Sequence, residues 1–290
     1  MIPIAELKQN LELNKSLGSV IETLKAGSAI QVREFQAKRR ASDKLFMMLK
    51  ECFDAISKRG AIKHPLFFYD KELPSCIILV TSDDGFVGEL NSAVINAALE
   101  ERKSQNDEIV VLGERGAGYF EDRSESFIPF PGISEDIKPA ELRSIKKHII
   151  SRYSNKRIGQ VKIVYPESTS VGSWKVAVTQ LLPLVPAQLM SDTAQNTSNI
   201  DLKDLLIEPS INSVAEGLVN LWLDVVLYNI FWSSKFSEFG ARLMHLEGSE
   251  QELGRMKQQL SLQYFKHVHA LADRTIREIL SARIGLGKAS

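Results

Sequence analysis

Proline placement constrains what this chain can fold into more than any other feature of its sequence. A proline inside a helix removes a backbone hydrogen bond and clashes with the preceding turn, at a cost of about 3 kcal/mol or more. The ten prolines leave two long gaps, because none lies between Pro3 and Pro65 and none follows Pro209. Both ends of the chain are therefore free to form long helices, whereas the middle must fold differently.

Apolar residues in both terminal segments recur at spacings of three and four, the period of one helix face. The pattern runs from Ile4 to Ile56 in the first segment and from Val214 to Leu271 in the last, where one extra step of four is a stutter. At about 1.5 Å per residue, such helices would reach roughly 80 and 110 Å, and rods of that length need to pair. The pattern predicts an antiparallel coiled coil of the two chain ends. Its apolar members in the first segment include Leu17, Val20 and Leu24.

Glycines leave one alternative open for the last helix. Each glycine weakens a helix by up to about 1 kcal/mol relative to alanine, so a break is conceivable where several occur. The last segment contains four candidates for such a break: Gly217, Gly240, Gly248 and Gly254.

The middle segment changes period, because short apolar runs alternate there with helical stretches. Such alternation is typical of a mainly parallel sheet with helices on its faces. The sequence thus predicts a long helix at 1–59, a Rossmann-like α/β domain at 60–208 and a second long helix at 209–290, with the α/β domain inserted into the coiled coil. The predicted strands are Cys76–Thr81, Ile109–Leu112, Phe127–Phe130, Val161–Tyr165 and Val176–Leu182, and the predicted helices between them include Asn91–Lys103 and Pro139–Tyr153.

Composition excludes several classes of protein. With 44% hydrophobic and 25% charged residues the chain is neither disordered nor collagen-like. Its 36 basic and 36 acidic residues balance, so it has no broad basic surface for nucleic acid or an anionic membrane. The two cysteines, Cys52 and Cys76, lack metal-ligand spacing and fit a reducing compartment. The N-terminal stretch meets a charge at Glu6 and has no apolar h-region, so no signal peptide is expected. The most apolar stretch, Leu218–Trp232, is interrupted by Asn220, Asp224 and Asn229, so no membrane span is expected.

Two glycine-containing strings are candidates for a nucleotide-binding loop. Phosphate binding needs a glycine loop at a strand end, where backbone N–H groups can approach the anion. Gly85 and Gly88 follow the first strand, but the carboxylates of Asp83, Asp84 and Glu89 would repel phosphate. The string GERGAG at 113–118 has its glycines in the wrong order and lacks the lysine of a P-loop. A dinucleotide site is therefore disfavoured.

The sequence also offers little support for a metal site or a catalytic site. The same three carboxylates could form a metal or acid–base site, but an exposed turn is the favoured interpretation. His267 and His269 lie two apart and so on different helix faces, and neither cysteine has a nearby histidine. We therefore predict no catalytic, cofactor-binding or metal-binding residue and no cofactor. Aromatic residues crowd the last helix, where core packing is favoured over a ligand box: Trp222, Phe231, Trp232, Phe236 and Phe239.

Three strings together resemble one family, the gamma subunit of F-type rotary ATP synthases. The string TSDDGFVGELN, Thr81–Asn91, resembles the family's TSDRGLCGGLN. QLLPL at 180–184 and IEPS at 207–210 resemble phrases that end the family's sheet domain. The matched residues are Thr81, Ser82, Asp83, Gly85, Gly88, Leu90 and Asn91 in the first string, and Ser237, Glu238, Ala241, Arg242, Leu260, Tyr264, Glu278 and Ile279 in the C-terminal helix pattern.

The resemblance implies a central rotor shaft. Its two terminal helices would form a coiled coil inside a hexamer of alpha and beta subunits, and its sheet domain would meet the epsilon subunit and the membrane ring of c subunits. The chain would catalyse nothing itself but would couple ion flow through the c-ring to the cycling of the catalytic sites. It would be peripheral, on the cytoplasmic face of an energy-transducing membrane, and would bind no nucleic acid.

Departures from the family pattern concern the surface that would face the hexamer. The resemblance implies that Lys25, Arg33, Gln36, Glu238 and Arg242 line this collar and shaft, but most other cations of the family's N-terminal phrase are missing between Ser16 and Gln36. The chain is therefore interpreted as a divergent gamma subunit, of the kind an alternative or accessory rotary ATPase would use. A non-rotary adaptor that keeps the gamma architecture is the alternative.

Overall fold

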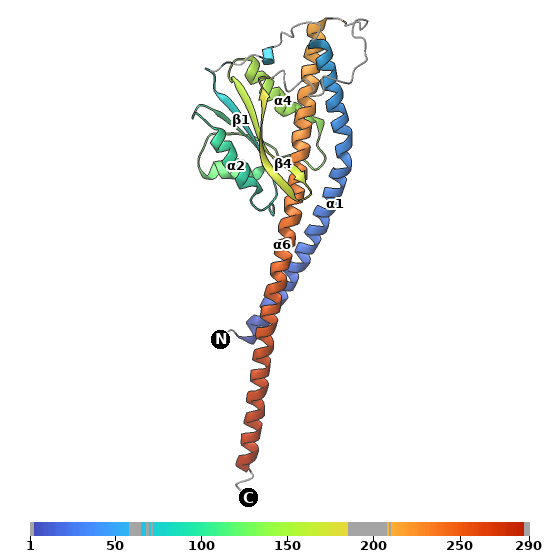
Figure 1. Ribbon diagram of the computed structural model, residues 1–290. Helices are drawn as coiled ribbons and strands as arrows, with labels where there is room; N and C mark the ends of the chain where they lie inside the picture. Colours follow the sequence, from blue (N-terminus) through green and yellow to red (C-terminus); the bar gives the residue numbers. More distant parts are fainter. Residues whose placement is uncertain are drawn as a thin grey trace. The chain divides into compact units, whose positions relative to one another are not determined.

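Two long helices frame the chain in the computed structural model, which describes residues 3–57, 65–67, 70, 72–184, 208 and 210–286. Helix α1 spans Ile4–Ser57 and helix α6 spans Ile211–Leu286, as the proline gaps predicted (Figure 1). Helix α6 is continuous through Gly217, Gly240, Gly248 and Gly254, so none of these glycines breaks it. The predicted boundary at 59/60 lies outside the described residues, as does residue 209, so the predicted domain limits stay predictions.

The chain divides into two compact units, and both long helices run through both of them. Unit 1 consists of Met1–Ser28 with Met244–Ser290, and unit 2 of Ala29–Leu243. Within unit 1 the two helices pair: the Asn14 side-chain amide donates to the Leu253 carbonyl oxygen at 3.2 Å, and Lys25 bonds Glu250. Contacts thus move backwards along α6 as they move forwards along α1, which is the predicted antiparallel pairing.

Unit 2 is built around a five-stranded sheet in the order β3-β2-β1-β4-β5. Strands β1 to β4 are parallel, and β5 pairs antiparallel with β4 as a hairpin. The Rossmann-like sheet predicted from the sequence is therefore confirmed, with β4 running several residues beyond its predicted end. The strands are β1 (Ser75–Val80), β2 (Glu108–Leu112), β3 (Ile128–Phe130), β4 (Gln160–Ser170) and β5 (Ser173–Leu182).

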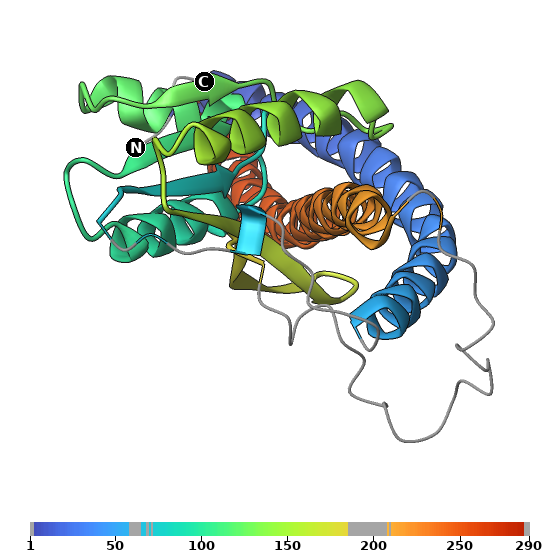
Figure 2. The same cartoon turned by 90° about the horizontal axis from the view of Figure 1, so that it is seen from above.

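Helices cover both faces of this sheet (Figures 1 and 2). Helices α2 (Leu90–Glu101) and α3 (Glu114–Asp122) pack against the side chains of Ile77 and Leu79. Helix α4 (Pro139–Ser154) and the first part of α6 pack on the opposite face, against Ile78 and its neighbours. A short 3-10 turn spans Pro65–Phe67. Burial on the α4 side of β1 raises the pKa of the Cys76 thiol to about 12.

The aromatic residues of α6 form core, as predicted. Trp232 stacks on Phe236 with ring centroids 5.1 Å apart, and Phe239 meets Phe35 of α1 edge to face. The indole N–H of Trp232 donates to the Phe35 carbonyl oxygen at 3.1 Å, which satisfies the polar end of a buried ring. In unit 2 this cluster ties α1 to α6.

Helix α6 also contains a window long and apolar enough to cross a bilayer. The window lies within Asn212–Ser281, has a mean hydropathy of 1.4 and is 44% buried. One such helix is a weak indication of a span, because the core helix of a folded domain has the same length and composition.

Candidate functional site

The string 81–91 lies at the carboxyl end of β1 and ties three elements together. The Thr81 hydroxyl is buried, donates to the Leu112 carbonyl oxygen at 2.7 Å and accepts from the Gly116 N–H at 3.0 Å. Glycine is required twice around it. Gly113 has a φ of +99° and Gly116 leaves no room for a methyl group, because a Cβ there would lie 2.6 Å from the Thr81 oxygen. Thr81 therefore locks β1 to the start of α3.

Ser82 and Asn91 close the loop between β1 and α2. The Ser82 N–H donates to the Asn91 side-chain oxygen at 3.0 Å, and the Asn91 amide donates to the Ser82 hydroxyl at 2.8 Å. The Ser82 hydroxyl in turn donates to the Asp84 carbonyl oxygen at 2.7 Å. Gly88, with a φ of +60°, turns the chain into α2. This part of the motif therefore fixes a loop shape with its own side chains.

Asp83 and Asp84 have different environments. The Asp83 carboxylate accepts from the Glu114 N–H at 3.0 Å, and Gly132 makes room for it, because a Cβ at Gly132 would lie 2.2 Å from its oxygens. The Asp84 side chain is 80% exposed. The exposed-turn interpretation thus describes Asp84, whereas Asp83 is a helix cap. Among the described residues, no group of three His, Cys, Asp or Glu side chains could hold a metal ion.

Helix α3, which the sequence interpretation missed, leaves no free N–H group for a phosphate at its start. The N–H groups of residues 113–116 donate in turn to Phe130 O at 3.3 Å, Asp83 Oδ1 at 3.0 Å, Ser82 O at 3.1 Å and Thr81 Oγ1 at 3.0 Å. A helix N-terminus binds anions through unsatisfied donors. Here the protein itself supplies every acceptor, which is a physical argument against the nucleotide interpretation of GERGAG.

Helix α6 approaches the same edge of the sheet with a buried charged network. Glu238 accepts from Arg242 at 2.7 Å and from Lys235 at 2.9 Å, and all three side chains are at most 10% exposed. The Arg242 Nε donates to the Gly85 carbonyl oxygen at 3.2 Å. Arg242 thus pins the loop after β1 to α6 while sharing one carboxylate with Lys235.

Small residues of α6 complete the contact on the β4–β5 hairpin. The Ser168 N–H donates to the Ser233 hydroxyl at 3.0 Å, and the Ser237 hydroxyl donates to the Pro166 carbonyl oxygen at 3.1 Å. One turn further, a Cβ on Gly240 would lie 2.8 Å from the backbone nitrogen at the hairpin tip. We call this set of contacts, from the loop 81–91 to the hairpin and residues 233–242 of α6, the α6 junction.

The junction occupies the position where doubly wound sheets usually bind ligands. Strand order reverses between β1 and β4, and the crevice outside their carboxyl ends is the usual ligand site of such sheets. Here α6 fills that crevice with buried side chains. The α6 junction is therefore suited to holding a helix rigidly on a sheet rather than to binding a small molecule.

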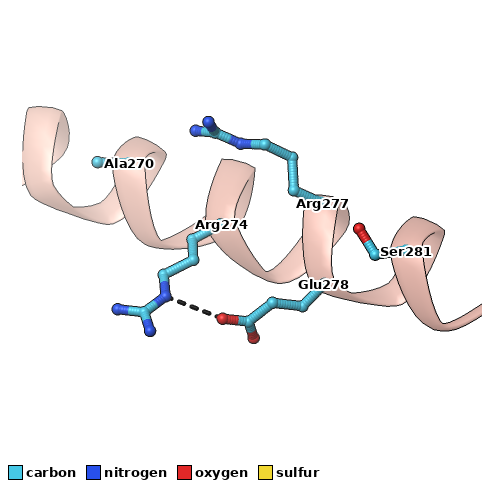
Figure 3. Close-up of a pocket in the computed structure, with 5 residues that line it drawn as sticks. All are labelled: Ala270, Arg274, Arg277, Glu278 and Ser281. Atoms are coloured by element: carbon cyan, nitrogen blue, oxygen red, sulfur yellow. Dashed lines mark hydrogen bonds and ion pairs between the residues drawn. The ribbon is translucent and has the colours of Figure 1, made fainter.

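A shallow hollow lies on residues 270–281 of α6. Ala270, Arg274, Arg277, Glu278 and Ser281 line it, all from this one helix, and Arg274 bonds Glu278 at 2.9 Å while Arg277 points away (Figure 3). These side chains are exposed, so the hollow lacks the enclosed, apolar walls of a ligand site.

The residues predicted to face a hexamer differ in exposure. Glu238 and Arg242 are buried in the α6 junction, whereas Arg33 and Gln36 are exposed on α1. Lys25 is half-buried, and its hydrogen bond to Glu250 raises the pKa of the Lys25 ammonium. Contact of any of them with a hexamer stays a prediction. The junction partners Ser233, Lys235 and Gly132 were missed, although small residues spaced 4-3 on an aromatic helix, at 233, 237 and 240, are a readable signal.

Solved structures share this fold. A chain of the rotor of the Euglena gracilis mitochondrial ATP synthase superposes with a TM-score of 0.66 at 15% identity, covering 93% of this chain and 98% of its own. A chain of the OSCP/F1/c-ring assembly of the same enzyme gives 0.71 at 16% identity, covering 98% and 94%. The architecture is that of the rotor chains of ATP synthases.

Sequence comparison gives the family. The ATP synthase family model matches residues 3–283. The gamma chain of Symbiobacterium thermophilum is 26% identical over 280 residues, 94% of this chain and 95% of the relative, and that of Pelotomaculum thermopropionicum is 23% identical over 290 residues, 99% and 100%. The chain belongs to the ATP synthase gamma family.

Proposed function

We propose that this chain is the non-catalytic rotor of an F-type ATP synthase, turning inside a hexamer of alpha and beta subunits. The α6 junction is the observation that carries this proposal. Torque can pass between a sheet domain and a shaft only through a connection that does not yield, and buried, fully paired polar groups make such a connection. Filling of the sheet's ligand crevice by α6, and the use of the α3 N–H groups by the protein itself, support a mechanical rather than a catalytic role.

The partners follow from the same proposal. The sheet domain would contact the epsilon subunit and the c-ring, and the helical ends would contact the alpha and beta subunits. Rotation driven by ion flow through the ring would then exchange the states of the catalytic sites. The chain would sit peripherally, on the cytoplasmic face of an energy-transducing membrane.

Native mass spectrometry of the tagged chain purified from its own membranes tests the assembly. We expect one copy with three alpha and three beta subunits, and ATP hydrolysis by the complex but not by the isolated chain. A free chain, or unrelated companions, would contradict the proposal. A complex that hydrolyses ATP without turning the chain, seen by a bead attached to the sheet domain, would favour the adaptor alternative.

The α6 junction supplies a second test inside the complex. Glu238→Gln should loosen the loop from α6 and lower the torque that a bead reports at unchanged ATP binding. Glu216→Gln, which removes an exposed carboxylate from the part of the same helix that lies in unit 2, is the matched control.

A further inference from the structure

Three Gly–Ser steps occur in the two long helices, and all of them lie in unit 1. They are Gly18–Ser19 and Gly27–Ser28 of α1 and Gly248–Ser249 of α6. Glycine is the weakest helix former after proline, and Gly/Ser pairs are among the few places where α-helices kink sharply. Both long helices therefore contain turns in unit 1 that cost little free energy to open or bend.

The packing of unit 1 does not explain these glycines. A glycine inside a helix is required where another chain segment approaches its backbone closely, as the hairpin tip approaches Gly240. A Cβ built on Gly27 or Gly248 would meet nothing within 4 Å, and both residues are exposed. Neither residue has the positive φ that favours glycine. The property of glycine that remains at these two positions is the flexibility of its backbone.

Two of the Gly–Ser steps lie at the same level of the helix pair. Lys25 of α1 bonds Glu250 of α6. Because the helices are antiparallel, the position two residues after Lys25 corresponds to the position two residues before Glu250. Gly27 and Gly248 occupy these positions. A helix packed on a straight partner is splinted by it, so one weak turn alone does not let a pair bend, whereas two weak turns at one level do.

Side-chain hydroxyl groups compete with the helix backbone near this level. The Ser249 hydroxyl donates to the His245 carbonyl oxygen at 3.0 Å, and the Thr23 hydroxyl donates to the Ser19 carbonyl oxygen at 2.9 Å. Such bonds to the carbonyl one turn earlier slightly destabilise a helix and often bend it. They also leave that carbonyl oxygen with a donor when the backbone N–H of the same turn moves away, which lowers the cost of opening the turn.

We propose that Gly27–Ser28 and Gly248–Ser249 form a joint at which the two helices of unit 1 open and bend together. Opening of the weak turn on α1 removes the support of the weak turn on α6, so the two turns open as one cooperative unit. Under a sideways or twisting load the helix pair yields at this level first, because each glycine lowers the cost of opening its turn. The joint is a property of the helix pair itself and does not depend on the proposed rotor function.

Hydrogen exchange of the full chain, resolved by mass spectrometry of its peptides, tests whether the two steps cooperate. Gly27→Ala changes only α1, but through the joint it should slow exchange of the amides 249–252 of α6 about fivefold, the ratio that glycine and alanine helix propensities predict. Gly248→Ala should slow the amides 28–31 of α1 by the same factor. The double variant should slow both segments about 25-fold, whereas two independent turns would each slow only about fivefold.

Gly217→Ala is the matched control. Gly217 lies in the unit 2 part of α6, a Cβ there would also meet nothing within 4 Å, and leucine rather than serine follows it. This variant should slow exchange around residue 217 and leave both segments of the joint unchanged. Slowing that stays on the substituted helix in Gly27→Ala and Gly248→Ala would show two independent weak turns and would overturn the joint. Exchange of both wild-type segments at the rate of an unstructured peptide would also overturn it.

A second measurement, in the complete complex, reports bending rather than opening. The angular spread of a bead attached to the sheet domain, recorded while ATP hydrolysis is stopped, measures how far the helix pair yields. The Gly27→Ala/Gly248→Ala variant should narrow this spread, and Gly217→Ala should not. An unchanged spread in the double variant would mean that the joint does not bend. Failure of the wild-type chain to enter the hexamer would count against the rotor function alone, because the exchange experiment needs no partner.

Discussion

The α6 junction of unit 2 and the helix pair of unit 1 use polar residues in opposite ways. In the junction, the charged side chains of α6 are buried and paired, with Glu238 between Lys235 and Arg242. In unit 1, Asn14 and Ser28 are buried as Leu7 and Leu246 are, while Leu13 and Leu17 are exposed. The first region pairs its charged groups within the chain, whereas the second leaves large apolar side chains such as Leu262 and Phe265 exposed. The contrast teaches that the charged groups of the junction are covered within the chain, whereas unit 1 leaves apolar surface exposed, and burial of such surface is favourable.

Removing the shared carboxylate of the junction should have the largest effect. Glu238→Gln removes the carboxylate that the buried Lys235 and Arg242 share and leaves Arg242 only the exposed Asp84 at 3.7 Å, which costs about 3–5 kcal/mol of the free energy of unfolding. Chemical denaturation followed by circular dichroism measures this. Glu278→Gln, which breaks the exposed pair with Arg274, should cost less than about 0.5 kcal/mol. Similar losses for the two variants would remove the distinction between a closed unit 2 and an open unit 1.

Gly113 should be the next most sensitive position. Gly113→Ala forces a side chain into a backbone with a φ of +99° and places its Cβ 2.3 Å from the Thr81 carbonyl oxygen, so we expect a loss of about 3 kcal/mol. Gly118→Ala, in the same helix with open space around it, should be neutral or gain up to about 1 kcal/mol. Thermal melting of the two proteins compares them, and equal melting temperatures would mean that the loop relaxes freely.

Much of the fold could be read from the sequence because it follows from local patterns. Proline gaps predicted both long helices, and the period change near residue 60 predicted the strands. Helix α3 was missed because GERGAG is glycine-rich, and its fold depends on acceptors from Asp83, Ser82 and Thr81 that lie elsewhere in the chain. Helical spacing grouped Leu17, Val20 and Leu24 with the coiled-coil pattern, but spacing alone cannot say which of two stripes faces the neighbouring helix.

The candidate site could likewise be predicted only in part from the sequence. The string 81–91 stood out through its family resemblance, but its roles are contacts with distant residues, such as that between Gly85 and Arg242. A single sequence does not contain these pairings explicitly. The small residues 233, 237 and 240 were visible, yet their meaning depends on the hairpin that approaches them.

Glycines of unit 1 should behave oppositely to Gly113. Gly248 and Gly254 lie in the interior of α6, exposed, with nothing within 4 Å of a built Cβ. Alanine at each position should stabilise the helix by about 0.5–1 kcal/mol. Helix content against temperature, followed by circular dichroism, measures the gain. A loss of stability at either position would indicate that unit 1 is closer packed than its exposure implies.

Unit 2 should lose stability as the pH falls, and this loss should be smaller than the effects of the substitutions above. Burial, together with the nearby Arg152 charge, lowers the pKa of His148 below its usual 6.5, and its buried Nε2 has no hydrogen-bond partner among the described residues. Between that lowered pKa and 6.5 the unfolded chain binds more protons than the folded chain. Stability is therefore full above pH 6.5 and falls as the pH drops through this window.

The variant His148→Leu isolates this contribution. Leucine keeps an apolar contact with Phe130, whose ring meets the imidazole edge to face, and it removes the titrating group. Denaturant unfolding at pH 7.5 and 5.5 should show a smaller loss on acidification for the variant than for wild type, since carboxylates common to both cancel in the comparison. An equally steep loss would assign the acid sensitivity to other groups, and unit 2 would then differ from unit 1 through its paired charges alone.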